Sequence, residues 1–427
     1  MHKRIMISRW IVWSLSLLCL QPVPPATADT VAATVVDVAT REPIAGATLV
    51  SGDRAWISDR KGEIVLPDMA PGAPMAVSVR APGYARVQAS LRGGGRASVA
   101  MTRIHPKAVY LSVYGIASRA LLDAVLALPE RSTINALVID VKGDRGMTPY
   151  RSPAREGIGA QAHVPANTPR VKDLPALVKS LHDRGLYLIA RIVVFKDDPL
   201  ARAHPEWAVR DAEGNVWRDR EQLRWIDPTI SAAWTHNLDV AEEAARMGFD
   251  EIQFDYLRFP DAPGLQFHET NTAEHRVGAI TGFLSAARER LLRYNVYLSV
   301  DIFGYVCWNL NDTAIGQQLE TLAEQVDYVS PMLYPSGFTR GLPGSDPPTD
   351  HPGEIVSRSL AQAMRRTGLP GVRFRPWLQA FRDYAFDRRN FGAAEIRAQI
   401  DAAEAAGTDG WMLWNPRNRY DPMTLPR

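Results

Sequence analysis

The chain has 427 residues, a formal net charge of +2 and 46% hydrophobic residues, a composition typical of a globular protein with a large core. The net charge is close to neutral, and the basic residues form neither a stripe nor a block of arginine and lysine, so nucleic acid is not an expected partner. The nine histidines show no metal-ligand spacing, and we expect neither a metal nor another cofactor. No pattern in the sequence indicates an oligomeric state.

Residues 1–28 have the pattern of a secretory signal peptide. A basic start, Lys3 to Arg9, precedes the apolar run Trp10 to Leu20, which is too short to span a bilayer as a helix. Ala26 to Ala28 then fits the small-residue cleavage pattern. We therefore expect export to the periplasm or the cell exterior, with a mature chain from Asp29 that contains no membrane span.

Residues 29–104 have the pattern of a small all-β domain. Short strand-like segments with glycine and proline turns between them are typical of a β-sandwich. The expected strands are Thr34–Val38, one within Pro43–Val50, Ile64–Pro67, Met75–Val79 and Ala97–Met101.

The same region resembles the carboxypeptidase-regulatory-like, transthyretin-like module. The resemblance rests on Pro43 to Ala47, on Ser58-Asp59 followed by Gly62, and on Ala81 to Tyr84. It implies an accessory domain that stabilises the protein or serves in adhesion, and that has no catalytic chemistry of its own.

Residues 105–427 alternate apolar strand-like runs with helical segments. Near-continuous apolar strands joined by helices indicate a parallel sheet covered on both faces, and eight such repeats predict a (β/α)8 TIM barrel. A doubly wound open sheet is the alternative, although no glycine-rich nucleotide motif supports it. The expected strands are Ala108–Val113, Ala136–Val141, Tyr187–Val194, Glu251–Tyr256, Val296–Ile302, Tyr328–Leu333, Phe374–Ala380 and Gly410–Trp414. The expected helices are Arg119–Leu128, Asp173–Arg184, Ala232–Met247, Ala273–Tyr294, Thr313–Gln325, Glu354–Thr367 and Ala393–Ala406.

Polar and aromatic side chains gather at the carboxyl ends of these strands, where barrel enzymes place their active sites. Asp255 and Asp301 end the neighbouring fourth and fifth strands, so their carboxyl groups could flank one glycosidic bond. One would protonate the leaving oxygen, and the other would attack or activate water. Arg258 could keep one of them ionised by pairing with it. The expected substrate contacts are Asp140, Lys142, Arg191, Arg258, Trp308, Tyr334, Trp377, Gln379, Trp414 and Asn415, the aromatic residues serving as platforms for sugar rings.

Residues 108–420 resemble a family of (β/α)8 barrels of the glycoside-hydrolase kind that was long classed as a domain of unknown function. The resemblance implies an exported, glycan-active protein in which Asp255 occupies the strand-four position of a nucleophile. Related barrels often supply the acid as Glu, whereas strand five here ends in Asp301, so Asp261, Glu269 and Asp383 remain alternative acids. The motifs that carry the resemblance are Ala136–Lys142, Ala190–Asp197, Trp225–Pro228, Gln253–Pro260, Val300–Gly304 and Val329–Pro335.

These observations predict an exported glycoside hydrolase that cleaves a polysaccharide or oligosaccharide with Asp255 and Asp301. Two other functions remain open. A non-catalytic glycan-binding barrel would keep the aromatic platforms and tolerate the loss of either carboxylate. An imine-forming aldolase would instead use Lys142, which would have to be buried with a lowered pKa.

Overall fold

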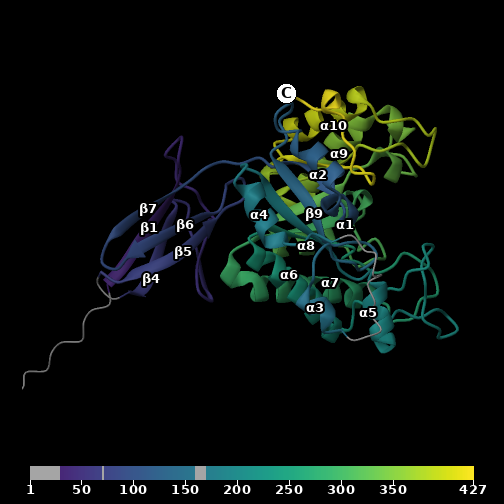
Figure 1. Ribbon diagram of the computed structural model, residues 1–427, viewed down its shortest axis with the longest axis horizontal. Helices are drawn as coiled ribbons and strands as arrows, with labels where there is room; N and C mark the ends of the chain where they lie inside the picture. Colours follow the sequence, from purple (N-terminus) through teal and green to yellow (C-terminus); the bar gives the residue numbers. More distant parts are fainter. Residues whose placement is uncertain (1–28, 70–71, 159–169) are drawn as a thin grey trace, which may run out of the picture.

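The structure, a computed structural model, describes residues 29–69, 72–158 and 170–427. Figure 1 shows a unit of β-sheets beside a larger barrel surrounded by helices. The predicted signal peptide lies outside the described residues. Within the described ranges, no helix is both long enough and apolar enough to cross a membrane.

The N-terminal unit consists of two sheets around a hydrophobic core of its own, consistent with the predicted sandwich. One sheet has the order β4–β1–β7, and the other has the order β3–β2–β5–β6. Two strands were not predicted, β3 and β6. Both are edge strands with few buried residues, and their sequences lack a continuous apolar pattern. The strands are β1 (Asp29–Asp37), β2 (Thr48–Ser51), β3 (Arg54–Ile57), β4 (Glu63–Met69), β5 (Pro74–Arg80), β6 (Val87–Arg92) and β7 (Arg96–Met101). The resemblance to the carboxypeptidase-regulatory-like module stays a prediction.

The larger unit is a closed barrel of eight parallel strands, which confirms the predicted (β/α)8 fold and excludes the open sheet. The predicted boundary after residue 104 falls between β7 and β8. The barrel strands are β8 (Lys107–Leu111), β9 (Ala136–Lys142), β10 (Tyr187–Val193), β11 (Glu251–Asp255), β12 (Tyr297–Phe303), β13 (Tyr328–Met332), β14 (Trp377–Gln379) and β15 (Trp411–Trp414). The helices are α1 (Val113–Ala117), α2 (Arg119–Leu126), α3 (Pro153–Glu156), α4 (Leu174–His182), α5 (Asp198–Ala203), α6 (Trp234–Met247), α7 (Ala273–Leu291), α8 (Leu319–Gln325), α9 (Pro352–Thr367) and α10 (Ala393–Ala405).

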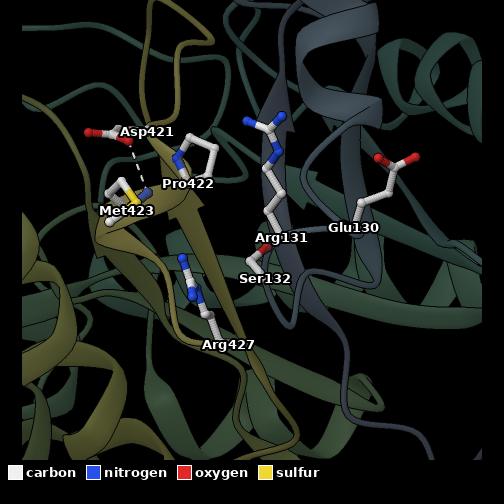
Figure 2. Close-up of a pocket in the computed structure, with 7 residues that line it drawn as sticks. All are labelled: Glu130, Arg131, Ser132, Asp421, Pro422, Met423 and Arg427. Carbon is white, nitrogen blue, oxygen red and sulfur yellow. Dashed lines mark hydrogen bonds between the residues drawn. The ribbon is translucent and has the colours of Figure 1, made fainter.

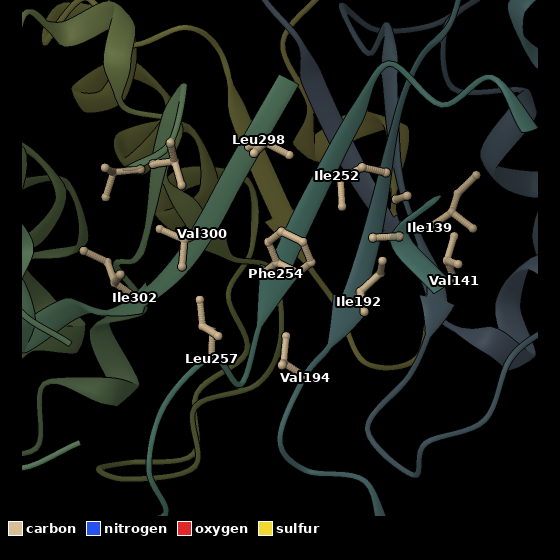
Figure 3. Close-up of a cluster of buried hydrophobic side chains, with 14 of the residues drawn as sticks. Ile139, Val141, Ile192, Val194, Ile252, Phe254, Leu257, Leu298, Val300 and Ile302 are labelled. Atoms are coloured by element: carbon tan, nitrogen blue, oxygen red, sulfur yellow. The ribbon is translucent and has the colours of Figure 1, made fainter. Parts of the chain in front are cut away.

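Alternate residues of the barrel strands form an apolar layer beneath the helices. Figure 3 shows Ile139, Ile192, Phe254 and Val300 in this layer, and the Phe254 ring packs edge-on against Phe283 of α7. Because successive residues of a strand point to opposite faces, their neighbours in sequence point into the barrel. The outward apolar set thus determines which polar side chains turn inward.

One expected helix, Thr313–Gln325, is shorter than predicted and begins only at Leu319. Thr313, Ala314 and Gly316 have φ angles of 56°, 58° and 82°. These left-handed conformations are incompatible with a right-handed helix, so the chain makes a turn before α8.

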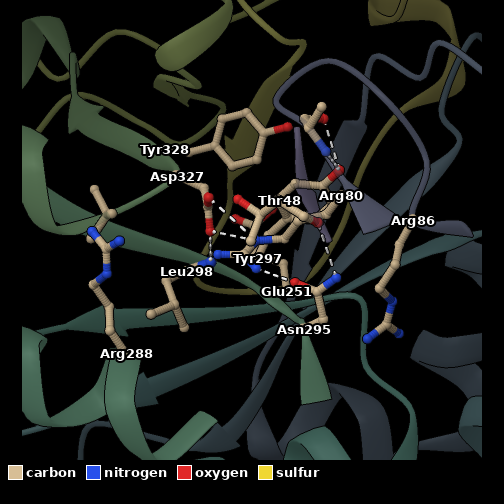
Figure 4. Close-up of polar contacts among 12 residues, drawn as sticks. Thr48, Arg80, Arg86, Glu251, Arg288, Asn295, Tyr297, Leu298, Asp327 and Tyr328 are labelled. Atoms are coloured by element: carbon tan, nitrogen blue, oxygen red, sulfur yellow. Dashed lines mark hydrogen bonds and ion pairs between the residues drawn. The ribbon is translucent and has the colours of Figure 1, made fainter. Parts of the chain in front are cut away.

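The sandwich packs against the amino end of the barrel. Tyr297 and Tyr328, which start β12 and β13, are buried at this contact (Figure 4). Both hydroxyl groups bond to the sandwich backbone. The Tyr297 hydroxyl donates to the carbonyl of Ala81 (2.8 Å), and the Tyr328 hydroxyl accepts from the Gly83 amide (3.0 Å). The sandwich therefore covers one end of the barrel and leaves the carboxyl ends of the strands open.

Candidate active site

Four ionisable side chains point into the barrel near the carboxyl ends of adjacent strands. They are Asp140 on β9, Arg191 on β10, Asp255 on β11 and Asp301 on β12. Their neighbours in sequence belong to the outward apolar layer, which forces this orientation. Asp255 is the most accessible of the four, with 7% of its surface exposed. The strand-end carboxylates predicted from the sequence therefore do converge, with Arg191 among them.

The Arg191 guanidinium binds three carboxylates at once. Its Nη1 donates to Oδ1 of Asp140 (2.7 Å), its Nε to Oδ2 of Asp255 (2.9 Å), and its Nη2 to Oδ1 of Asp144 (3.1 Å). Burial disfavours its charge, but the three carboxylates, Asp255 first, raise the pKa of Arg191 well above its ordinary value. The planar five-donor group is suited to this role, and it stays charged in the barrel.

Asp255 lies in a cavity of about 170 Å³, hereafter the Asp255 cavity. Its carboxylate also accepts the amide hydrogen of Tyr256 at 2.5 Å. Tyr256 has a φ angle of 48°, a strained conformation that is frequent at functional sites. The cavity is lined by Asp144, Arg191, Asp255, Tyr256, Arg258, Phe303, Met332, Tyr334, Trp377 and Trp414.

Asp301 does not line this cavity but lies one side chain away from it. It is 1% exposed, and its Oδ1 accepts a hydrogen bond from the indole Nε1 of Trp377 at 2.8 Å. Its Oδ2 has no hydrogen-bond partner among the described residues. Burial, followed by the negative charge of Asp255, raises the pKa of Asp301 well above its ordinary value. The neutral form of Asp301 is therefore favoured beside the ion pair of Asp255 and Arg191.

A second hollow of about 200 Å³, hereafter the Tyr110 hollow, adjoins the Asp255 cavity. The Tyr110 hydroxyl donates to Oδ2 of Asp140 at 2.6 Å, and its ring stacks on Trp414 with centroids 3.9 Å apart. Burial raises the pKa of Asp140 to about 6, although Arg191 acts in the opposite direction. The hollow is lined by Tyr110, Ser112, Val113, Tyr114, Asp140, Gly143, Asp144, Arg145, Met147, Glu221, Trp414 and Pro416.

Arg258 lines the Asp255 cavity, but the structure gives it a different role from the one expected. Its guanidinium lies over the rings of Phe303 (4.7 Å) and Trp225 (4.8 Å) and donates to a backbone carbonyl. Burial lowers its pKa. We expected Arg258 to pair with one of the two aspartates. Asp255 pairs with Arg191 instead, because β10 is the hydrogen-bonded neighbour of β11.

Lys142, expected as a substrate contact, is completely buried and lines neither hollow. The pairing of β9 with β10 shifts by one residue just before Lys142, which coincides with its departure from the inward alternation. Its Nζ pairs with Asp197 at 2.6 Å and donates to Asn237 at 2.6 Å. Lys142 thus joins β9 to the segment after β10 and to α6.

Three further expected contacts also lie outside both hollows. The indole of Trp308 donates to Ser359 of α9 at 3.0 Å. Gln379 and Asn415 bind the backbone of the loops after β13 and β14. Gln379 accepts the amide hydrogen of Ser336 at 3.0 Å, and Asn415 donates to the Ala380 carbonyl at 2.7 Å. The alternative acids Asp261, Glu269 and Asp383 line neither hollow. The remaining aromatic predictions, Tyr334, Trp377 and Trp414, do line the Asp255 cavity.

Tyr110 and Asp144 were not predicted as site residues. Tyr110 lies on the first predicted strand, and the alternation of that strand could have placed it inside the barrel. Asp144 lies in the loop after β9, where no periodicity indicates which way a side chain points. Among the described residues, no group of three or more His, Cys, Asp or Glu side chains is placed to hold a metal ion.

A larger hollow, of about 660 Å³, lies elsewhere, between Arg131, Met423 and Arg427 (Figure 2). Its residues 130–132 precede β9, so it is near the amino end of that strand and away from the inward carboxylates. Arg131 and Arg427 are exposed and Met423 is 67% exposed. Size alone does not make this surface depression the active site.

The profile of the family described as "Putative glycosyl hydrolase domain" matches residues 108–420. No curated protein matches the sequence. The glycoside hydrolase domain of PgaB (BpsB) from Bordetella bronchiseptica is 14% identical with a TM-score of 0.52, over 73% of this chain and 94% of that one. Alpha-L-fucosidase isoenzyme 2 from Paenibacillus thiaminolyticus is 14% identical with a TM-score of 0.50, over 75% and 48% of the two chains. A hypothetical protein from Ruminiclostridium thermocellum ATCC 27405 is 36% identical with a TM-score of 0.40, over 45% of this chain and 96% of that one. The first two similarities show a shared barrel fold.

Proposed function

The chain belongs to this family of glycosyl hydrolase domains, and on that premise we propose that it hydrolyses a glycosidic bond in the Asp255 cavity. The observation that carries the proposal is the contrast between two adjacent carboxyl groups. Asp255 is paired with a buried arginine and lines the cavity, whereas Asp301 is fully buried with its pKa raised toward the neutral form. Glycoside hydrolysis needs one carboxylate and one carboxylic acid.

Asp255 takes the role of nucleophile or general base in this proposal. Its Oδ2 is fixed by Nε of Arg191, and the side chain opens onto the cavity beside Trp377 and Tyr334. The arginine compensates the carboxylate charge before substrate arrives, so little reorganisation accompanies the reaction. A sugar ring held against the aromatic walls would present its anomeric carbon to Asp255.

Asp301 takes the role of the acid. Burial and the neighbouring Asp255 raise its pKa, and its Oδ2, which has no hydrogen-bond partner among the described residues, is the oxygen that we assign to the proton. Because Asp301 lies behind the cavity wall, its side chain has to turn past Trp377 to reach a leaving oxygen. Loss of the Trp377 hydrogen bond would accompany that movement.

The aromatic lining favours a carbohydrate over a charged small metabolite. Tyr334, Trp377 and Trp414 offer apolar faces around a few convergent polar groups, the usual composition of a ligand site. The glycan that is cleaved is therefore expected to be bound by stacking as well as by hydrogen bonds.

The experiment is to measure reducing-sugar release from a panel of bacterial and plant polysaccharides by the wild type, Asp255→Asn and Asp301→Asn. We expect the wild type to release sugar and each variant to lose at least about a thousandfold in rate, on the order of 4 kcal/mol of transition-state stabilisation. Asp401→Asn, at an exposed position on α10, is the control that keeps the wild-type rate. Melting curves establish that the variants fold.

No release from any glycan, with equal binding of one glycan by the wild type and both site variants, would contradict hydrolysis. It would support the alternative of a non-catalytic glycan-binding barrel. Release that survives Asp301→Asn but not Asp255→Asn would retain the hydrolase and remove Asp301 from the acid role.

We also place this activity outside the cytoplasm, in the periplasm or beyond it. The support is the basic and apolar start of the sequence with its Ala26 to Ala28 cleavage pattern. N-terminal sequencing of the protein recovered from periplasmic and culture fractions tests this proposal. A mature chain that begins near Asp29 is the expected result, and an intact Met1 in the cytoplasmic fraction is the contrary one.

A further inference from the structure

The Asp255 cavity and the Tyr110 hollow share two lining residues, Asp144 and Trp414. Their volumes of about 170 and 200 Å³ are each smaller than the roughly 300 Å³ at which small-molecule sites begin. Together they exceed that bound. The two hollows are therefore more consistent with two parts of one site than with two separate sites.

Trp414, which separates the two hollows, is held on several sides. Its ring is stacked on Tyr110 at 3.9 Å and meets Trp377 edge-on at 5.4 Å. The Arg191 guanidinium lies 4.9 Å from its ring centre. Because Arg191 also binds a carboxylate in each hollow, one arginine and one indole connect the two parts. These contacts hold the Trp414 ring, hereafter the Trp414 ridge, in one orientation, so a ligand that lies across it meets a preformed surface.

The Tyr110 hollow has the groups that a sugar ring requires. Asp140 is 2% exposed and offers a buried carboxyl group, and Tyr114 offers a half-exposed aromatic side chain. Gly143 lies closely against the carboxyl group, since a Cβ there would lie 3.1 Å from Oδ2 of Asp140 and 3.0 Å from Val113, so a larger residue would shift the carboxyl group. A carboxyl group can accept hydrogen bonds from sugar hydroxyls, and an aromatic side chain can pack on the apolar face of a ring.

We propose that the Tyr110 hollow binds the sugar residue adjacent to the one in the Asp255 cavity. The substrate is then a glycan of at least two contiguous sugar residues that crosses the Trp414 ridge, and simple monosaccharide glycosides are poor substrates. This inference rests on the proposed function for the identity of the ligand as a carbohydrate. It does not depend on which carboxyl group acts as the acid.

The test measures binding, so that it is independent of turnover. Calorimetry on the Asp255→Asn protein compares cellobiose, N,N′-diacetylchitobiose and xylobiose with their monosaccharides. We expect at least one disaccharide to bind about tenfold more tightly than its monosaccharide, the usual gain from one additional pocket contact. Tyr114→Ala and Gly143→Ala, added to the same protein, should abolish that gain and leave monosaccharide binding unchanged. Trp56→Ala, at a partly exposed aromatic residue of the sandwich, is the control that preserves it.

Two outcomes would overturn the inference: every disaccharide binding no more tightly than its monosaccharide, or a gain that survives both Tyr114→Ala and Gly143→Ala. The proposed function fails in a different way. If no glycan is hydrolysed while the disaccharide gain is present and is lost in the two variants, the second sugar position stands and only the hydrolysis is wrong.

Discussion

Arg191 donates from Nε to Oδ2 of Asp255 across 2.9 Å, and from Nη1 of the same guanidinium it binds Asp140 at 2.7 Å. A single buried side chain therefore positions one carboxyl group in each of the two hollows. The arrangement follows from the strand order, because β10 lies between β9 and β11 in the barrel.

Replacing Arg191 by Lys should be strongly destabilising. Lysine keeps the charge but presents one compact donor group, which cannot satisfy Asp140, Asp144 and Asp255 together. We expect the free energy of unfolding, measured with urea at pH 7.5, to fall by about 3 kcal/mol, as for a broken buried ion pair. Arg290→Lys is the matched control, because Arg290 also pairs with two carboxylates but is 44% exposed. A loss no larger than that of the control, within about 1 kcal/mol, would contradict the role given to Arg191.

Asp140 should make the stability depend on pH in a specific direction. Its pKa in the folded chain is raised from 3.8 to about 6, so the folded chain binds the proton more tightly than the unfolded chain. The contribution of the protonated group is therefore fully present below about pH 4 and is lost as the pH rises to about 6. Relative to Asp140→Asn, the wild type should lose about 3 kcal/mol across this window. Denaturant curves at half-unit pH steps measure the difference, and parallel profiles for the two proteins would show that the shift is absent.

The buried pair of Lys142 and Asp197 should be structural. Burial lowers the pKa of Lys142 to about 8, while Arg155 and Lys142, against the opposing effect of burial, hold the pKa of Asp197 below its ordinary value. Lys142→Met leaves Asp197 with Arg155, at 3.0 Å, as its arginine or lysine partner, and should reduce the free energy of unfolding by about 3 kcal/mol. The double variant with Asp197→Asn should be less destabilised than the sum of the single variants. Additive losses would mean that the two residues do not interact.

Borohydride trapping should fail at Lys142. An imine-forming lysine must reach a carbonyl substrate, but this amine is bound to Asp197 and Asn237 and lines neither hollow. We expect no mass increase on the Lys142 peptide after borohydride treatment with pyruvate or dihydroxyacetone phosphate. Labelling of that peptide would reopen the aldolase alternative.

The contact between sandwich and barrel can be tested with two glycines that have the same backbone requirement. Gly83 and Gly46 have φ angles of 86° and 74°, so alanine is strained at both. A Cβ at Gly46 meets open space, whereas one at Gly83 would lie 2.9 Å from Val372 of the barrel. Gly83→Ala should therefore lower the melting temperature by several degrees more than Gly46→Ala. Equal shifts in scanning calorimetry would show that the contact contributes little to stability.

The periodicity of the sequence was sufficient for the barrel. Strand and helix patterns depend on neighbouring residues, and the inward position of Asp255 follows from the outward apolar Phe254 alone. The helix expected from Thr313 failed where local conformation overrode the apolar spacing, since residues 313, 314 and 316 are left-handed. Left-handed backbone conformations do not change the spacing of apolar residues, so periodicity could not predict this break.

The candidate site was predicted only in part, and the errors share a cause. The ion partner of Asp255 is Arg191 on the adjacent strand and not the sequence neighbour Arg258, and Lys142 leaves the inward alternation where β9 changes register with β10. Asp144 reaches the site from a loop.

The sequence by itself determined the eight-stranded barrel and which carboxyl groups stand at its strand ends, because these depend on local spacing. Only the tertiary structure decided which of them share Arg191, that Asp301 lies behind the cavity wall with a raised pKa, and that the cavity has a neighbouring hollow. Those properties depend on distances between residues far apart in sequence, and the closure of the barrel sets these distances.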